Sequence, residues 1–181
     1  MPERDTISWT AMIAAYAQHG ESERARKIFY QMQKQGILPN KVTCLSIISA
    51  CGHTGEVEEG YYWFISMNLI FAVTPIVDHY NCMIDLLGRA GRLDEAENLM
   101  TSMSSSQVTI VSIMALISSC KYQLDVERAQ RFAKQAFTLF PEFAEPYIML
   151  AHIYSTVGRI QDAENLMAIM RGKGLEEQID L

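Results

Sequence analysis

The sequence lacks the motifs on which most enzymes and metal proteins depend. One histidine begins an H-x-E pattern, His19-Gly20-Glu21, but the four cysteines form no C-x-x-C pair to complete a zinc site, and neither G-x-S-x-G nor G-x-x-x-x-G-K-[ST] occurs. These absences argue against a zinc deaminase, a serine hydrolase of the α/β type and a P-loop nucleotide site. We therefore expect a protein that is not an enzyme, with no catalytic residue, no metal site and no cofactor.

Long apolar runs and an excess of basic charge are missing as well. No apolar stretch reaches the ~18 residues of a membrane span, so no membrane contact is expected. The net charge is −6 and the isoelectric point is near 5.2, which argues against a tight, non-specific grip on nucleic acid. The first residues, MPERDTISW, have neither the apolar core of a signal peptide nor the pattern of a transit peptide.

What the sequence does contain is a repeat of about 35 residues. Three tracks of equivalent positions share the same successive spacings of 35, 36, 33 and 34 residues. The small-residue track is Ala25, Gly60, Ala96, Ala129 and Ala163; the anchor track is Trp9, Cys44, Tyr80, Ile113 and Tyr147; the third is Met32, Met67, Met103, Ala136 and Met170. A period of this length is typical of helix-pair solenoids, which bind extended partners.

Each repeat is predicted to be a helix, a tight turn and a second helix. Apolar residues recur at i, i+3 and i+4 in both halves, and glycines such as Gly20 and Gly55 separate the halves. The fold class expected is all-α, an α-solenoid with a right-handed superhelix of about five helix-turn-helix repeats. The fourth repeat has Leu124 where glycine is expected, so its inner turn should differ. Apolar faces around Ile7 and Met170, in the end repeats, should be exposed unless they are covered, and self-association or a bound partner would follow.

The second helices open with acidic residues and carry the small-residue track. Negative charge in a first turn is favoured by the helix dipole, so the acids at Glu23, Glu58 and Asp94 are interpreted as helix-stabilising, not as metal ligands or acid–base pairs. Small residues such as Ala96 should let the two helices of a repeat approach closely. The four cysteines fall in helix-like segments and are expected to be buried free thiols.

Several segments resemble plant pentatricopeptide repeat proteins of the PLS subfamily. They are AMIAAYAQHG, IISACGHTGEVEEG and HYNCMIDLLGRAGRLDEAENLM. The resemblance covers nearly the whole chain and implies three parts. Residues 1–5 would be the tail of a preceding repeat, and residues 6–109 would form three repeats of P, L and S type. Residues 110–181 would be an E extension of two repeats similar to pentatricopeptide or tetratricopeptide repeats.

The resemblance also implies which residues read RNA. In this family one repeat addresses one base, through the residue after the anchor of the first helix and the last residue of the repeat. Carried onto this chain, the base-reading residues are Thr10 with Asn40, an adenine-type combination, and Asn81 with Thr109, which leans to a pyrimidine. The corresponding apolar residues are Leu45, Ile76, Met114 and Ile148, which have no hydrogen-bonding groups for a base edge and suit a protein interface instead.

The resemblance implies a sequence-selective protein that binds single-stranded organellar RNA. The usual role in the family is a specificity factor for C-to-U editing, and this chain would recruit a deaminase in trans or an editing cofactor through its C-terminal repeats. Its location would be the mitochondrion or the chloroplast, the transit peptide being absent from this chain. The alternative is a protein-binding scaffold similar to tetratricopeptide repeats that reads no RNA, which the net acidity and the apolar C-terminal repeats favour.

Overall fold

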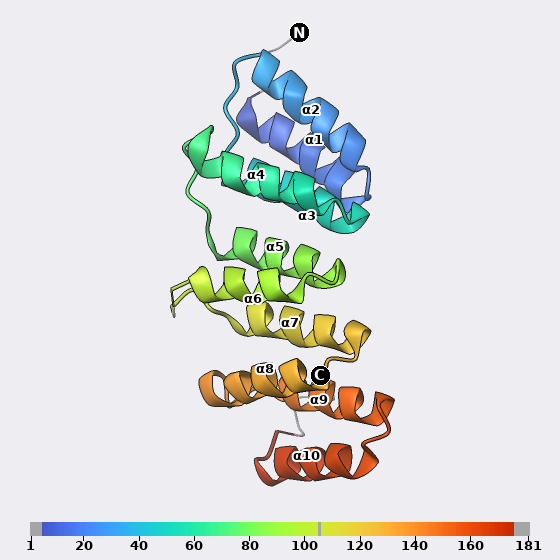
Figure 1. Ribbon diagram of the computed structural model, residues 1–181. Helices are drawn as coiled ribbons and strands as arrows, with labels where there is room; N and C mark the ends of the chain where they lie inside the picture. The colour runs from blue at the N-terminus through green and yellow to red at the C-terminus, as the bar shows by residue number, and fades with distance from the viewer. Residues whose placement is uncertain (1–4, 105, 176–181) are drawn as a thin grey trace. The chain divides into compact units, whose positions relative to one another are not determined.

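The computed structural model describes residues 5–104 and 106–175, and this part of the chain contains ten α-helices and no strand (Figure 1). The helices are α1 (Thr6–Gln18), α2 (Ser22–Lys34), α3 (Lys41–Thr54), α4 (Val57–Leu69), α5 (Val77–Arg89), α6 (Leu93–Ser102), α7 (Ile110–Gln123), α8 (Val126–Leu139), α9 (Glu145–Thr156) and α10 (Ile160–Gly172). Taken in pairs along the chain, they correspond to the five predicted repeats. The all-α prediction is confirmed.

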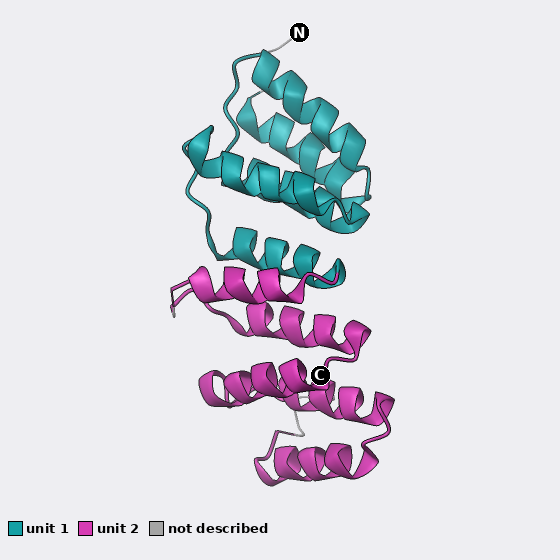
Figure 2. Cartoon of the chain, in the orientation of Figure 1, with its two compact units in different colours: residues 1–90 teal, residues 91–181 magenta. Residues whose placement is uncertain are grey.

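The helices group into two compact units, residues 1–90 and 91–181 (Figure 2). In the first unit α1 packs on both α2 and α3, and α3 packs on α4 and α5. In the second unit α7 contacts α6, α8 and α9, and α9 packs on α10. Within each unit the first helices of successive repeats are therefore neighbours, as a stacked repeat requires.

The small-residue track lies where helices approach most closely. Ala25, Ala96 and Ala129 are fully buried. A Cβ atom built on Gly60 would lie 2.4 Å from Cδ2 of Leu86 and 3.6 Å from Cβ of Cys51. Even an alanine at position 60 would thus displace Leu86, which explains why this position of the track has no side chain.

The inner turns share one backbone conformation, including the turn that has no glycine. Gly20, Gly55, Gly91 and Gly158 have φ between 72° and 81°, and Leu124 has φ of 56°. The prediction that the fourth turn differs is therefore wrong. The backbone N–H groups of Leu124 and Asp125 bond back to Lys121 and Cys120 of α7, which closes the helix end in the usual left-handed way despite the strain.

Replacing Leu124 by glycine should stabilise the chain by about 0.5–1 kcal/mol. Glycine adopts positive φ without the clash between Cβ and carbonyl oxygen, and Leu124 is 54% exposed, so little packing is lost. Urea unfolding followed by circular dichroism measures the change. Leu38→Gly is the control, because Leu38 is 74% exposed and its φ is not positive. A loss of stability in Leu124→Gly as large as in Leu38→Gly would contradict the expectation.

The apolar faces of the first and the last repeat differ in their exposure to solvent. Ile7 is 75% exposed, as the sequence indicates, whereas Met170 is only 1% exposed. Met170 packs in a cluster with Ala144, Tyr147 and Leu175, the last of which follows α10 and covers its inner face. The face around Met170 is therefore covered by the chain itself and not by a partner, because Leu175, which follows α10, packs against Met170.

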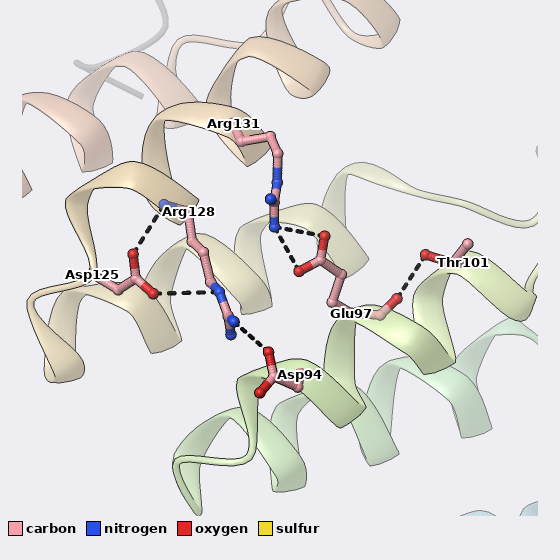
Figure 3. Close-up of polar contacts among 6 residues, drawn as sticks. All are labelled: Asp94, Glu97, Thr101, Asp125, Arg128 and Arg131. Carbon is pink, nitrogen blue, oxygen red and sulfur yellow. Dashed lines mark hydrogen bonds and ion pairs between the residues drawn. The ribbon is translucent and has the colours of Figure 1, made fainter.

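The acidic first turns are present, and acidic residues in or near them also join successive second helices. In the second unit Arg128 bonds Asp94 and Asp125, and Nη2 of Arg131 lies 2.6 Å from both carboxylate oxygens of Glu97 (Figure 3). In the first unit Arg26 makes a bidentate contact with Glu56 at 2.8 and 3.1 Å. Hydrogen bonding to Arg26 lowers the pKa of Glu56. These pairs tie α6 to α8 and α2 to α4, a role that the helix-dipole interpretation did not include.

Candidate nucleic-acid interface

The residues predicted to contact bases stand on or next to the N-terminal turns of the first helices. The anchors Trp9, Cys44, Ile113 and Tyr147 are buried, and Tyr80 is partly buried with its ring 5.2 Å from that of Phe64. Because each anchor is fixed in the core, the residue after it has a defined position on every first helix. The second member of each predicted pair is the N-cap residue of the next first helix, as Asn40 is for α3 and Thr109 for α7.

Thr10 and Asn40, the first predicted pair, meet through a third residue. Oγ1 of Thr10 lies 2.7 Å from Oγ1 of Thr43, and Thr10 is 7% exposed. Oδ1 of Asn40 accepts from the backbone N–H of Thr43 at 2.9 Å and from its hydroxyl at 3.0 Å. The backbone N–H of Asn40 donates to Oγ1 of Thr43 at 3.2 Å. Thr10 is thus not a solvent-facing polar residue, whereas Asn40 is exposed.

The predicted pair of the second repeat, Leu45 and Ile76, occupies the equivalent positions but has apolar side chains. Leu45 is partly buried, and Ile76, the N-cap residue of α5, is 37% exposed and has no polar side chain. His79 takes over the capping role: its Nδ1 accepts from the backbone N–H of Ile76 at 3.2 Å, and its Nε2 lies 2.9 Å from the carbonyl oxygen of Lys41. Because an amide N–H only donates and a carbonyl oxygen only accepts, these contacts fit the tautomer with its proton on Nε2.

The remaining predicted residues are spread over both compact units. Asn81 is partly buried on α5 in the first unit, and Thr109 caps α7 in the second, where its side chain bonds Ser112. The joint role of these two residues stays a prediction. Met114 is partly buried and Ile148 is 36% exposed, so both retain apolar surface outside the core. Their assignment to a protein interface also stays a prediction.

The sequence interpretation did not connect one set of exposed aliphatic residues with the candidate base-contacting positions. The exposed aliphatic residues are Ile7, Val42 and Val111, with 75%, 57% and 58% of their surface exposed. Each lies two residues before the anchor of its repeat, and so three residues before the candidate base-contacting residue. Residues at i and i+3 share one face of a helix, so aliphatic side chains flank the candidate base-contacting positions. The signal was available, because these positions follow the same irregular spacing as the anchor track, with Asp78 and Glu145 in the other two repeats.

The described residues give no evidence of a metal site, a membrane span or a reactive thiol. They contain no group of three or more histidine, cysteine, aspartate or glutamate residues placed to hold a metal ion. No helix in this part of the chain is both long and apolar enough to cross a membrane. The cysteines are free, and burial raises the pKa of Cys44 to about 11 and those of Cys51, Cys82 and Cys120 to about 12. The prediction of buried free thiols holds for Cys44, Cys51 and Cys120, whereas Cys82 is only partly buried, and the raised pKa favours the unreactive protonated thiol.

Sequence comparison finds pentatricopeptide repeats in this chain. A model described as the PPR repeat family matches residues 4–53, and two models described as PPR repeat match residues 42–69 and 73–104. Two Arabidopsis thaliana relatives are the pentatricopeptide repeat-containing proteins At2g03880, mitochondrial, and At2g13600. Each is 37% identical over 178 residues, which is 98% of this chain but only 28% and 25% of the respective relatives. The chain thus spans about a quarter of the length of the relatives it matches.

Structural comparison gives the same architecture. The crystal structure of the pentatricopeptide repeat protein PPR10 from maize matches 95% of this chain with a TM-score of 0.76 and 24% identity. A structure of PPR10 in complex with an 18-nt psaJ RNA element matches 97% with a TM-score of 0.73 and 16% identity. In each case the match covers about a quarter of the PPR10 chain. The fold is an all-α helical-repeat solenoid, as the sequence predicts.

Proposed function

We propose that this chain, which contains pentatricopeptide repeats like those of its plant relatives, belongs to a protein that binds single-stranded RNA and reads individual bases. The observation that carries the proposal is the linked arrangement of Thr10, Thr43 and Asn40. Thr10 and Asn40 are 30 positions apart, and each has a side chain that can hydrogen-bond the edge of a base. Both side chains hydrogen-bond Oγ1 of Thr43, which brings them close together. A similar fold in PPR10 occurs in complex with RNA, which supports the same class of ligand here.

The surface around this network suits a splayed base. Ile7 precedes Thr10 by one helical turn on α1 and is mostly exposed, and Val42 lies next to Thr43 on α3 and is also exposed. An aliphatic side chain contacts the face of a base while the polar groups of Asn40 address its edge. The resemblance implies adenine at the first repeat, any base at the second and a pyrimidine at the third, where Asn81 supplies an amide.

The finer role that we propose is a specificity factor for C-to-U editing of organellar transcripts. The resemblance of the three N-terminal repeats to the PLS subfamily supports it, and several relatives carry mitochondrial in their names, which favours an organelle. The deaminase would act in trans, recruited through the C-terminal repeats, where Met114 and Ile148 present apolar surface at the equivalent positions.

A second candidate is a protein-binding scaffold without RNA reading. It is favoured by the second compact unit, in which the residues after the anchors are Met114 and Ile148, and by the net charge of −6. Apolar side chains at these positions bury surface against a protein partner but offer no hydrogen bond to a base.

A titration of the chain with short single-stranded RNA against salt separates the two functions. For an RNA-binding protein, the logarithm of the affinity should fall linearly with the logarithm of salt concentration, with a slope of about −0.7 for each phosphate contacted. We expect measurable binding at low salt and a shallow slope, because a chain with a net charge of −6 contacts few phosphates. Absence of binding at low salt would contradict the proposal and favour the scaffold.

A further inference from the structure

We propose that Thr43 is a specificity-determining positioning residue for the base read by Thr10 and Asn40. Thr43 belongs to the following repeat and lies on α3, whereas Thr10 lies on α1. Its hydroxyl orients the hydrogen-bonding groups of both predicted reading residues, so that together they favour an amino-bearing base. The inference deepens the proposed RNA-binding function and rests on it.

The orientation of the Asn40 amide follows from its partners. Oδ1 of Asn40 receives the backbone N–H of Thr43 at 2.9 Å, and a backbone N–H can only donate. The atom facing Thr43 is therefore the carbonyl oxygen of the side chain, and it is engaged twice, since the hydroxyl of Thr43 lies 3.0 Å away. The amide nitrogen Nδ2, a donor only, is the group that Asn40 has left for a ligand, and the residue is exposed.

The direction of the hydroxyl bonds follows by the same reasoning. Thr43 has one hydroxyl proton, and Oδ1 of Asn40, as a pure acceptor, takes it. Oγ1 of Thr43 must then accept at its other contacts, from the backbone N–H of Asn40 at 3.2 Å and from the hydroxyl of Thr10 at 2.7 Å. The proton of Thr10 thus points to Thr43, and what Thr10 offers to a ligand is the lone pairs of its oxygen.

Together the two residues present one acceptor and one donor. Adenine and cytosine match this pattern on the Watson–Crick edge, since each has an amino group that donates next to a ring nitrogen that accepts. When the exocyclic group of the base faces Thr10, uracil and guanine place a carbonyl oxygen against the lone pairs of Thr10 and a ring N–H against Nδ2 of Asn40, so that like groups face each other. Without the hydroxyl of Thr43, the hydroxyl of Thr10 can rotate and donate, so the distinction between amino and keto bases weakens.

The capping bonds predict that the hydroxyl can be removed without losing the helix. In Thr43→Val the backbone bond from residue 43 to Oδ1 of Asn40 remains, so the N-cap of α3 is kept. Thr43→Ser restores the hydroxyl with a smaller side chain. Ser46→Ala is the matched control, because Ser46 is also buried on α3 but its hydroxyl bonds the carbonyl oxygen of Val42 on its own helix.

The test uses the whole chain and a random pool of short single-stranded RNAs, from which bound sequences are selected and read. The base addressed by Thr10 and Asn40 is the one whose preference changes in Asn40→Asp. Two RNAs that differ there as A and U then serve as probes at constant low salt. We expect the wild-type chain, Thr43→Ser and Ser46→Ala to favour A over U by about tenfold, and Thr43→Val to reduce the ratio to about twofold or less.

The outcomes separate the inference from the function on which it rests. If the wild-type chain binds no RNA or shows no base preference, the proposed function fails and the inference fails with it. If the wild-type chain discriminates and Thr43→Val discriminates equally well, only the role of Thr43 is refuted. Circular dichroism verifies that each variant is folded at the assay temperature, and Thr43→Ala replaces the valine variant if that one does not fold.

Discussion

Replacing His79 by alanine should lower the free energy of unfolding by about 3 kcal/mol, the largest effect on stability that we expect from one substitution outside the aromatic and aliphatic core. His79 is completely buried, and its two ring nitrogens bond the backbone of Ile76 and of Lys41, 38 positions away. Alanine leaves the N–H of Ile76 without its capping partner and opens a space the size of an imidazole ring between α3 and α5.

Urea unfolding followed by circular dichroism measures this change, and His53→Ala is its control. His53 is exposed in the last turn of α3, so its removal should change the free energy of unfolding by no more than about 0.5 kcal/mol. Equal effects of the two alanine substitutions would show that the buried contacts of His79 contribute nothing beyond helix propensity.

The largest functional effect is expected from the double variant Thr10→Asn with Asn40→Asp. The preference for A over U at the base read by this pair should reverse, with the affinity ratio changing by at least about tenfold. The carboxylate introduced at position 40 would present an acceptor in place of the Nδ2 donor and so match the ring N–H of uracil, while an amide at position 10 supplies a donor for a uracil carbonyl. Asn81 already occupies the position equivalent to Thr10 on α5, so the fold accommodates an asparagine there.

Binding of matched RNAs that carry A or U at this base measures the change by fluorescence anisotropy. Aspartate is as good an N-cap as asparagine, so α3 should keep its start and the variant should remain folded. Asn98→Asp on α6 controls for the added negative charge, because it is exposed and far in the sequence from the reading residues. An unchanged ratio in the double variant would refute base reading by Thr10 and Asn40.

The periodic features of the fold could be predicted from the sequence because they depend on local spacing. The recurrence of Trp9, Cys44, Ile113 and Tyr147 places one side chain per repeat on the buried face, and all four are buried. Alanine or glycine on the small-residue track indicates a close helix approach, and at Gly60 even a Cβ atom would collide with Leu86 of α5. Such patterns report which face of a helix a residue occupies, and that is fixed by 100° per residue.

Features that depend on a partner from another repeat could not be predicted in this way. The sequence shows Thr10 and Thr43 as polar residues 33 positions apart, but not that their hydroxyls meet at 2.7 Å. It gives no sign that His79 caps its own helix at Ile76 while bonding Lys41. The spacing of residues along a helix predicts which face a side chain occupies, but it does not predict which atoms of a distant segment that side chain contacts.

By itself the sequence determined the helix pairs, their number and the buried face of each helix, because periodicity, glycines and small residues act within one turn or one helix. Only the tertiary structure decided the left-handed backbone of Leu124, the burial of Met170 under Leu175 and the hydroxyl network that joins Thr10 to Asn40. At Leu124 the hydrogen bonds that close the end of α7 outweigh the local preference of leucine, and in the other two cases a contact with another segment decides, which the local pattern does not specify.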